Sequence, residues 1–224
     1  YLMDPQELLV AGTGDVKYIT DCVSAFICGP NQPEPLKLKL PDVEKAKQLI
    51  KDSGYDGAKI VYLNASDQSE LARVATVFTE RMKAAGLNVD LQDMDWATMT
   101  TRRSNKSAPA TSDAGWNLFT TSRPGPSAVN PIQNSALDTS CDQKNWFGWP
   151  CDEGMQKLRE KYLASDTREQ KLAVEDEINQ RFKDTLPYIT IGKILRPTVA
   201  SQKYVTGFLP ANRLVPWNIV KEGN

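Results

Sequence analysis

The side chains best suited to recognising a small molecule are aromatic, and three of them lie close together on a polar loop. These are Trp146, Phe147 and Trp149, and Trp116 lies on a predicted strand that precedes the loop. Aromatic rings provide a large apolar contact area at a low entropy cost, which suits binding of an organic solute. The loop is therefore a candidate recognition site. The alternative is that its rings pack against the helix that follows and only anchor the loop.

Histidine is absent from the sequence, which bears on both catalysis and metal binding. Without it, a serine or cysteine nucleophile lacks its usual general base, and a transition metal lacks its commonest neutral ligand. A hydrolase or transferase that works through paired carboxylates stays open as an alternative. The absence of histidine therefore disfavours catalysis, and we expect no catalytic residues, no metal site and no cofactor.

Four cysteines form two close pairs along the chain, Cys22 with Cys28 and Cys141 with Cys151. Their spacings, with no histidine nearby, match no zinc signature. Two short-loop disulfides suit a chain that folds in an oxidising compartment. We predict both disulfides, with buried free thiols as the alternative.

Two charged clusters are assigned to solvated structure rather than to binding. Asp90, Asp93 and Asp95 lack the glycine turn and the glutamate of an EF-hand loop, so we expect a solvent-facing strand and a helix cap. Arg102 and Arg103 are predicted to form the exposed C-terminal end of a short helix. Their charge complements the helix dipole there, which we favour over an anion clamp.

Helices are predicted where a capping residue precedes apolar positions at helical spacing. The predicted starts are single caps at Asp4, Asp42 and Asp95 and capping boxes at Asp67 with Glu70 and at Thr167 with Gln170. Another helix is predicted from the apolar face formed by Met155, Leu158 and Tyr162. Six helices are therefore expected to surround the strands.

Strands are predicted from short β-prone runs over 58–63, 87–91, 115–120, 188–192 and 203–208. The first two flank a helix through tight connections, and this βαβ pattern indicates parallel strands with a right-handed crossover. Between the third strand and the next helix, residues 121–150 show no convincing periodicity. Loops of this length inside a compact domain are usually functional.

Composition excludes several classes of protein. The 27 basic and 28 acidic residues nearly cancel, and no basic cluster interleaved with aromatics suggests nucleic acid binding. The apolar runs are strand-sized, such as 59–63, whereas a membrane span needs about 20 residues.

The chain begins at Tyr1 without an initiator Met or a secretory segment. We therefore expect a piece of a parent roughly twice its length.

The helix predicted over 42–54 begins Asp-Val-Glu-Lys-Ala and ends at a glycine. It resembles a helix of the extracellular solute-binding proteins of family 5, the dipeptide, oligopeptide and nickel class. Later features follow in the family's order: the helix end over 81–89, the Asp95-Trp96 step, the Gly115-Trp116 strand, an irregular loop, a helical hairpin over 158–182 and the segment 186–189. The resemblance spans residues 42–208 and rests on the order and spacing of these motifs.

The resemblance implies an α/β fold, a type II periplasmic-binding-protein lobe with a mixed, mainly parallel sheet flanked by helices. Residues 1–41 are then an entry helix and a proline-rich connecting segment. Residues 42–208 form the main ligand-binding lobe, and 209–224 form a C-terminal tail that leads towards a missing second lobe.

The function that the resemblance implies is that of the substrate-binding component of an ABC importer, periplasmic or extracellular and membrane-associated. Such proteins trap a small organic solute, peptide-like or other, between two lobes by hinge closure and deliver it to a cognate permease in the membrane. We expect a monomer that binds no nucleic acid. The alternatives are a carboxylate-dependent hydrolase or transferase domain and a surface interaction module.

By position, Trp116 matches a pocket-lining tryptophan of the family, and the loop after it faces the cleft. Peptide binders of the family place an aspartate three residues later to pair with the ligand's α-ammonium group, and here that residue is Phe119. We therefore expect a solute without a free ammonium group, held in part by neutral hydrogen bonds. The predicted ligand-binding residues are Trp116, Asn117, Phe119, Thr120, Trp146, Phe147 and Trp149.

Overall fold

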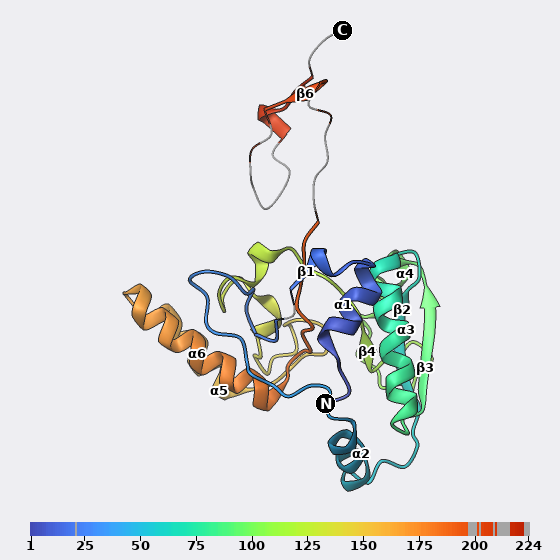
Figure 1. Ribbon diagram of the computed structural model, residues 1–224. Coiled ribbons are helices and arrows are strands. Elements are labelled where there is room, and N and C mark those ends of the chain that lie inside the picture. Colours follow the sequence, from blue (N-terminus) through green and yellow to red (C-terminus); the bar gives the residue numbers. More distant parts are fainter. Residues whose placement is uncertain (21, 197–200, 202, 208, 210–215, 222–224) are drawn as a thin grey trace.

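The computed structural model describes residues 1–20, 22–196, 201, 203–207, 209 and 216–221. The α-helices are α1 (Pro5–Thr13), α2 (Val43–Asp52), α3 (Ser69–Ala84), α4 (Trp96–Arg102), α5 (Glu153–Leu163) and α6 (Arg168–Thr185). The strands are β1 (Ile19–Thr20), β2 (Ile60–Ala65), β3 (Val89–Met94), β4 (Leu118–Phe119), β5 (Lys193–Ile194), β6 (Val205–Thr206) and β7 (Val220–Lys221). Short 3-10 helices are η1 (Val16–Tyr18), η2 (Gly125–Ala128), η3 (Ser135–Leu137) and η4 (Pro216–Asn218). All six predicted α-helices are present (Figure 1).

A three-stranded parallel sheet in the order β3-β2-β4 lies on the side of the molecule away from α5 and α6, with β3 at its outer edge (Figure 1). Helix α3 connects β2 to β3, which confirms the predicted βαβ unit. In register, Ile60 lies beside Val89 and Leu63 beside Phe119. Two antiparallel pairs, β1 with β5 and β6 with β7, complete the strands. The fold is therefore α/β with a parallel sheet and helices, as predicted, but among the described residues the antiparallel strands form separate pairs and do not join that sheet to make it mixed.

Strand β2 is buried on both faces, so its successive side chains enter two different cores. Tyr62 packs on the side covered by α3. Val61 and Leu63 face the other side, where Met99 of α4 and the partly buried Trp116 pack against them. The alternation along β2 thus separates a helix-covered face from a face that continues into aromatic side chains.

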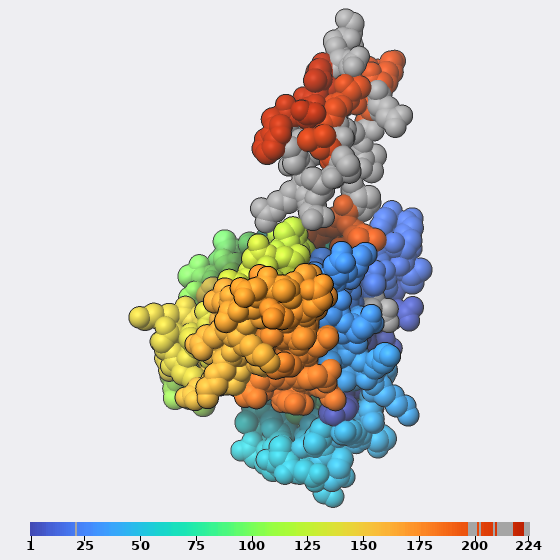
Figure 2. All heavy atoms as spheres, turned by 90° about the vertical axis from the view of Figure 1, so that its left-hand side faces the viewer, coloured from blue at the N-terminus to red at the C-terminus, as the bar shows by residue number. Residues whose placement is uncertain are grey.

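Helices α5 and α6 form a hairpin with a core of its own. Met155, Ile178 and Phe182 are buried there together with Phe26 and Leu36 from the segment before α2. Figure 2 shows this N-terminal segment, in blue, against the orange hairpin. The connecting segment therefore contributes side chains to the core of the lobe.

Most of the predicted helix starts are confirmed. Backbone N–H groups donate to the side chains of Asp4, Asp42 and Asp95 at the beginnings of α1, α2 and α4. Thr167 and Gln170 form a complete capping box at α6. These interactions satisfy N–H groups that have no partner within the helix.

The capping box predicted at Asp67 and Glu70 is wrong. Helix α3 begins after Gln68, which makes no side-chain cap hydrogen bond. The Asp67 carboxylate instead accepts from the backbone N–H of Trp96 at 2.9 Å, and Glu70 pairs with Arg196. The first N–H groups of α4 also lack partners within their helix, so they compete for the same carboxylate.

Three predicted strands differ from the structure. Within residues 115–120, only the two residues of β4 form a strand. Residues 188–192 contain no strand, and the next one, β5, begins at Lys193. Tyr188 packs on Phe182 in the hairpin core with ring centroids 4.8 Å apart, so its apolar character serves helix packing. Of the strand predicted over 203–208, β6 is present and the last residue lies outside the described residues.

Both predicted disulfides are confirmed, Cys22–Cys28 and Cys141–Cys151. The second closes the loop over residues 141–151, called here the disulfide-closed loop, which ends directly before α5.

Within the described part of the chain, no helix has the length and apolar character of a membrane span. Much of the predicted tail over 209–224 lies outside the described residues.

Candidate ligand-binding site

Five aromatic side chains from two separate segments meet on one face of the sheet. Trp116 and Phe119 come from β4 and the residues before it, and Trp146, Phe147 and Trp149 come from the disulfide-closed loop. Ring centroids lie 5.3 Å apart for Trp116–Phe119, 6.1 Å for Trp116–Trp149, 6.3 Å for Phe119–Phe147 and 5.1 Å for Trp146–Phe147. All five are only partly buried. We call them the aromatic cluster.

Contacts around Trp116 hold its side of the cluster against the sheet. Val61 donates its N–H to Asn117 Oδ1 at 2.8 Å, and its carbonyl oxygen accepts from the Asn117 N–H at 2.9 Å. The Trp116 indole N–H donates to the Asn105 carbonyl oxygen at 3.1 Å. At Gly115 a Cβ atom would lie 2.5 Å from a backbone nitrogen, so only glycine fits there. The position and orientation of Trp116 are therefore set by backbone contacts.

The disulfide-closed loop is fixed at its base and near its centre. The Asn145 amide donates to the carbonyl oxygens of Asp138 at 2.9 Å and Pro150 at 2.6 Å. At the base, the Asp152 N–H donates to the Thr139 carbonyl oxygen at 2.9 Å, and the Thr139 hydroxyl donates back to the Asp152 carbonyl oxygen at 2.8 Å. A loop held at these points can present its rings with little further loss of entropy on binding.

Arg103 extends into the aromatic cluster. Its Cζ lies 4.2 Å from the ring centroid of Phe147, 5.5 Å from that of Phe119 and 5.7 Å from that of Trp146. Among the described residues its side chain has no hydrogen bond or ion pair, and its Nε is buried without a partner. Burial lowers the pKa of this guanidinium. The prediction that Arg103 lies at the C-terminal end of a helix is therefore confirmed, since Arg103 caps α4, but its side chain is partly buried rather than exposed.

Arg123 is a second cation at the cluster, and we refer to Arg103 and Arg123 as the cluster arginines. The Cζ of Arg123 lies 4.6 Å from the ring centroid of Trp146 and 6.0 Å from that of Tyr188. Its Nη1 donates to the side-chain oxygen of Asn134 at 2.5 Å. Burial lowers the pKa of Arg123 as well. Trp146 therefore lies within cation–π distance of two guanidinium groups.

Two further cations have structural roles beside the cluster. Lys106 Nζ lies 5.2 Å from the ring centroid of Trp149 and donates to the Gln143 carbonyl oxygen at 2.6 Å. Arg102 turns away from the rings and donates to the carbonyl oxygens of residues 113–115, with distances of 2.7 to 3.2 Å. Arg102 thereby links α4 to the segment that leads into Trp116.

The carboxylates in and beside the disulfide-closed loop are engaged with other partners. Asp142, within the loop, accepts from the Lys144 N–H at 2.9 Å. Asp138 pairs with Arg159 at 3.0 Å, and Asp152 accepts from Arg181 Nε at 2.8 Å. The hydrogen bonds from Arg181 hold the pKa of Asp152 below its usual value. Among the described residues, no carboxylate forms a salt bridge with either cluster arginine. The charge at the cluster is therefore positive.

Two predicted ligand-binding residues make hydrogen bonds within the protein. The Asn117 side-chain oxygen accepts from Val61, and Thr120 Oγ1 pairs with the Tyr62 hydroxyl group. Tyr62 belongs to the core on the α3 side of the sheet, and burial raises its pKa to about 12. The structure thus brings five of the seven predicted residues together, while Thr120 is bonded to the opposite core.

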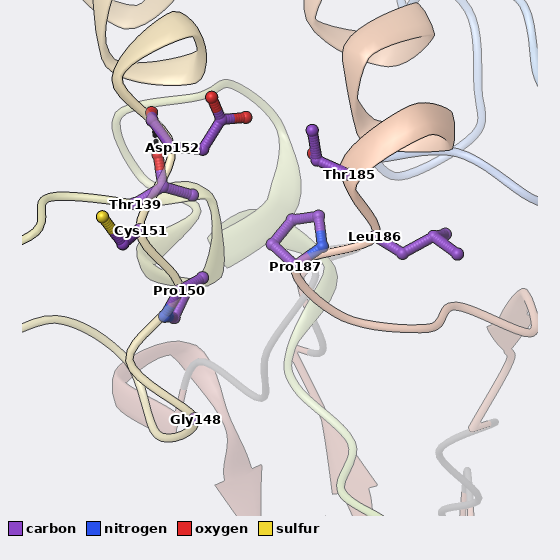
Figure 3. A pocket seen from close by; sticks show the side chains of 8 residues that line it. All are labelled: Thr139, Gly148, Pro150, Cys151, Asp152, Thr185, Leu186 and Pro187. Carbon is purple, nitrogen blue, oxygen red and sulfur yellow. Dashed lines mark hydrogen bonds between the residues drawn. The ribbon is translucent and has the colours of Figure 1, made fainter. Parts of the chain in front are cut away.

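Two surface hollows lie near the cluster. The first, of about 470 Å³, lies between the disulfide-closed loop and the C-terminal end of α6, with Pro150 and Pro187 on opposite sides (Figure 3). The second, of about 500 Å³, is lined by α4 and the residues that follow it. No ring of the cluster lines either hollow. We assign the candidate site from the rings and cations rather than from the depth of a hollow.

The cluster arginines are the functional candidates that the sequence-based prediction missed. Arg103 follows Trp96 by two helical turns, a spacing that places both on one face of α4, and its Cζ lies 5.7 Å from the Trp96 ring centroid. That spacing could have identified Arg103. Arg123 has no comparable local signal, because its partners Trp146 and Tyr188 are far away in the sequence.

Residues 3–134 of the chain match the model of a protein family described as bacterial extracellular solute-binding proteins, family 5 Middle. The matched range is more than half of the 224 residues. The chain belongs to this family. Its members are described as solute-binding proteins, which agrees with the family predicted from the order of the sequence motifs.

The family 5 chain is 30% identical over 225 residues to the probable peptide ABC transporter periplasmic-binding protein y4tO of Sinorhizobium fredii (strain NBRC 101917 / NGR234). The alignment covers 99% of the chain and 42% of that protein. The chain therefore spans less than half the length of this relative.

Solved structures of similar fold cover nearly all of the family 5 chain. AgaA from A. tumefaciens R10, in complex with agropinic acid, has a TM-score of 0.74 at 17% identity, with 100% of this chain and 46% of AgaA covered. AppA from Bacillus subtilis, in complex with a nonapeptide, has a TM-score of 0.73 at 13% identity, with 99% and 46% covered. These similarities identify the fold as the predicted type II periplasmic-binding-protein lobe.

Proposed function

We propose that the chain is a ligand-binding lobe of the substrate-binding component of an ABC importer. It captures a small organic solute at the aromatic cluster, in a cleft that a second lobe closes, and delivers the solute to a cognate permease in the membrane. The protein is periplasmic or extracellular and membrane-associated, and it acts as a monomer. Membership of family 5 and the description of the Sinorhizobium fredii relative as a peptide ABC transporter component support this proposal.

The observation that carries the proposal is the partial exposure of five aromatic rings on a rigid frame. The rings come from β4, the residues just before it and the disulfide-closed loop, and these segments are held by hydrogen bonds between side chains and backbone groups. Large apolar surface kept outside a core usually marks a site where another molecule binds. Rings on an ordered loop suit a small solute, because little entropy is lost when the solute covers them.

The other half of the site comes from a second lobe in this proposal. The Sinorhizobium fredii relative is more than twice as long as the part that aligns with this chain, since the alignment covers 42% of it. The remaining length supplies the opposite wall of the cleft. The tail over 209–224 leads towards that lobe, and closure buries the solute from both sides.

The class of solute is not set by the fold. The solved relatives were obtained with ligands as different as agropinic acid and a nonapeptide. The contacts we propose are the five rings of the cluster and the exposed amide group of Asn117. Thr120, through Tyr62, belongs to the frame that supports them. Phe119 offers no counter-charge to a ligand ammonium group, which favours a solute without one.

The test uses the intact two-lobe protein and a library of peptides and small organic acids, amides and sugars, screened by thermal shift and tryptophan fluorescence. Trp146→Ala is expected to weaken the affinity for the best solute about thirtyfold, as for a central aromatic contact. Leu163→Ala is the control, because Leu163 is 66% exposed at the end of α5 and distant from the rings in the fold.

Two results would count against the proposal. One is the absence of any stabilising solute in the library, and the other is a Trp146→Ala protein that binds as tightly as the unmodified protein. Chemical turnover of a bound solute would favour the alternative, an enzyme that works through carboxylates.

A further inference from the structure

The arginines of the described chain fall into two groups according to their partners. One group donates to carboxylates or to backbone carbonyl oxygens and consists of Arg73, Arg81, Arg102, Arg159, Arg168, Arg181 and Arg196. The cluster arginines, Arg103 and Arg123, do neither within the described residues. Both are partly buried, so their positive charge is partly removed from water without a protein counter-charge.

The Arg103 guanidinium has aromatic rings against its faces but, among the described residues, no hydrogen-bond acceptors for its N–H groups. Rings contribute cation–π attraction to a guanidinium, whereas its N–H groups lie in its own plane and need oxygen acceptors. The closest ring, Phe147, lies 4.2 Å from Cζ, and Nε is buried without an acceptor. The two terminal nitrogens also make no hydrogen bond within the described residues and are not buried in the same way, so an acceptor from outside the protein can reach them. Arg103 is therefore arranged to receive a hydrogen-bond acceptor.

Arg123 is held by a neutral group that leaves its charge in place. Its partner, Asn134, is fully buried and is itself fixed by donating to the Ala25 carbonyl oxygen and the Tyr188 hydroxyl group, each at 2.9 Å. An amide oxygen orients a guanidinium without neutralising it, and one bond leaves most of the five N–H donors free. Arg123 is thus oriented while most of its hydrogen-bonding capacity stays available.

The two guanidinium groups share one ring. Their Cζ atoms lie 5.7 Å and 4.6 Å from the centroid of Trp146, for Arg103 and Arg123 respectively. Trp146 belongs to the aromatic cluster, so both cations adjoin the surface that the proposed solute covers. A negative group on a solute that covers Trp146 would therefore be attracted by both positive charges.

We propose that the solute is an organic acid, whose carboxylate is bound by Arg103 and Arg123 while its apolar body lies on the aromatic cluster. This inference rests on the proposed function and specifies the class of solute. A carboxylate matches the planar fork of a guanidinium and supplies both the missing acceptors and the missing charge. The apolar side chain of Phe119 agrees with it, because an acidic residue beside Arg103 would occupy the same donors.

A purely structural role for the cluster arginines makes a different prediction. Guanidinium groups that only cover the rings would contribute to the stability of the protein. Their loss would then weaken the binding of acidic and neutral solutes equally. Groups that bind a carboxylate would discriminate between a solute and its uncharged analogue. The charge preference of binding therefore separates the two roles.

The first experiment measures binding by the intact two-lobe protein to matched probes. Each set contains a carboxylate, its primary amide and the corresponding amine: phenylacetate, phenylacetamide and phenethylamine, then the same three groups on indole and on a six-carbon chain. We expect the carboxylate to bind at least about tenfold more tightly than its amide, and the amine most weakly. Equal or tighter binding of amides or amines overturns the inference.

The failure of this inference is distinguishable from failure of the proposed function. If no matched probe binds while a peptide or sugar from the wider library does, the organic-acid proposal is overturned and the transport function stands. If no member of either library binds, the proposed function fails and the inference fails with it.

The second experiment removes each cation in turn. Arg103→Gln and Arg123→Gln are expected to weaken binding of the carboxylate about thirtyfold and binding of its amide by a much smaller factor. Arg196→Gln is the matched control, because Arg196 is 62% exposed and pairs with Glu70. Equal losses for carboxylate and amide overturn the inference.

A conservative variant covers the case in which Arg103→Gln does not fold. Arg103→Lys retains the charge but lacks the planar fork, so it is expected to lower the ratio of carboxylate to amide affinity by a smaller factor. An unchanged ratio in Arg103→Lys, together with an unchanged ratio in Arg123→Gln, also overturns the inference.

Discussion

The central strand β2 and the aromatic cluster share one face of the sheet, yet they bury their side chains to different degrees. Leu63 is fully buried and Val61 is 5% exposed. Phe119, which lies in register beside Leu63, remains partly exposed, as does Trp116. The buried residues are held by packing, whereas the rings are held by backbone hydrogen bonds, a disulfide and cations.

Neighbouring residues on this face of the sheet therefore have different roles: the buried ones stabilise the fold, and the partly exposed rings are available for recognition. Apolar surface left uncovered forgoes about 25 cal/mol per Å² of stabilisation. The lobe obtains that stabilisation from its sheet and its α5–α6 hairpin and keeps the rings available. A solute that covers the cluster recovers it as binding free energy. Changes in β2 should therefore alter folding, and changes in the cluster should mainly alter binding.

The largest expected effect is on the folding side of this comparison. Leu63→Ala removes a fully buried side chain from the central strand and should lower the free energy of unfolding by about 3 kcal/mol. Urea unfolding measures the loss. Leu163→Ala, at a site that is 66% exposed, should stay within about 0.5 kcal/mol of the unmodified protein. A loss below about 1 kcal/mol for Leu63→Ala would contradict the assignment of β2 to the core.

A second change acts on the frame of the rings. Replacing Cys141 and Cys151 with serine should lower the free energy of unfolding by about 2 to 3 kcal/mol and weaken solute binding, because the ring-bearing loop loses its closure. The matched control replaces Cys22 and Cys28, which lie outside the cluster. The variant without Cys22 and Cys28 should be less stable than the unmodified protein but should bind the solute with the same affinity. Equal losses of affinity in both double variants would show that the loop closure has no special role.

A third change introduces a negative charge into the aromatic cluster, beside the cluster arginines. In Phe119→Asp, a carboxylate replaces a ring whose centroid lies 5.5 Å from the Arg103 Cζ, and it should pair with that cation. Binding of organic acids should then fall about tenfold, and binding of the matching amines should improve. Phe119→Leu should retain the original charge preference. Calorimetric titration with phenylacetate and phenethylamine measures both, and an unchanged preference in Phe119→Asp would argue against a cationic site.

The smallest expected effect concerns the helix that follows the disulfide-closed loop. Asp152 caps α5 and pairs with Arg181, which lowers its pKa in the folded state. Its stabilising contribution is therefore fully present above the unfolded pKa, about 4, and is lost as the pH falls through the lower folded value. Asp152→Asn keeps a capping oxygen but loses the charge, so its deficit in melting temperature should be present at neutral pH and vanish in acid.

The control for this prediction is a double variant. Arg181→Gln should add little further loss in the Asp152→Asn background, because the ion pair is already gone. Melting temperatures between pH 7 and pH 3 measure both variants. A deficit that does not change with pH would mean that the ion pair makes no contribution.

The frame of the lobe could be predicted from the sequence because its signals are local. Asp42 and Asp95 bond to N–H groups three residues away, and apolar spacing alone defines the buried side of α3. Asp67 could not be assigned in the same way, because its partner Trp96 lies 29 positions further along the chain. The apolar run that includes Tyr188 was equally ambiguous, since a strand and a packing contact use the same side chains.

The site was predictable only in part for the same reason. The types of its rings and their position on a long irregular loop indicate recognition, and all five rings meet. Which charges accompany them depends on contacts between distant segments. Arg123 meets Trp146 and Tyr188 only because the fold brings the segment after β4 against the disulfide-closed loop and the α5–α6 hairpin.

The disulfide-closed loop leaves and re-enters the lobe at nearly the same point. The Cα atoms of Cys141 and Cys151 are 4.5 Å apart, and Thr139 and Asp152 are joined by two hydrogen bonds just outside them. The start of α5 is therefore fixed at the base of the loop, independently of the ring-bearing residues further along it. Substitution of a ring at its tip is then expected to change what the lobe recognises while α5 keeps its place.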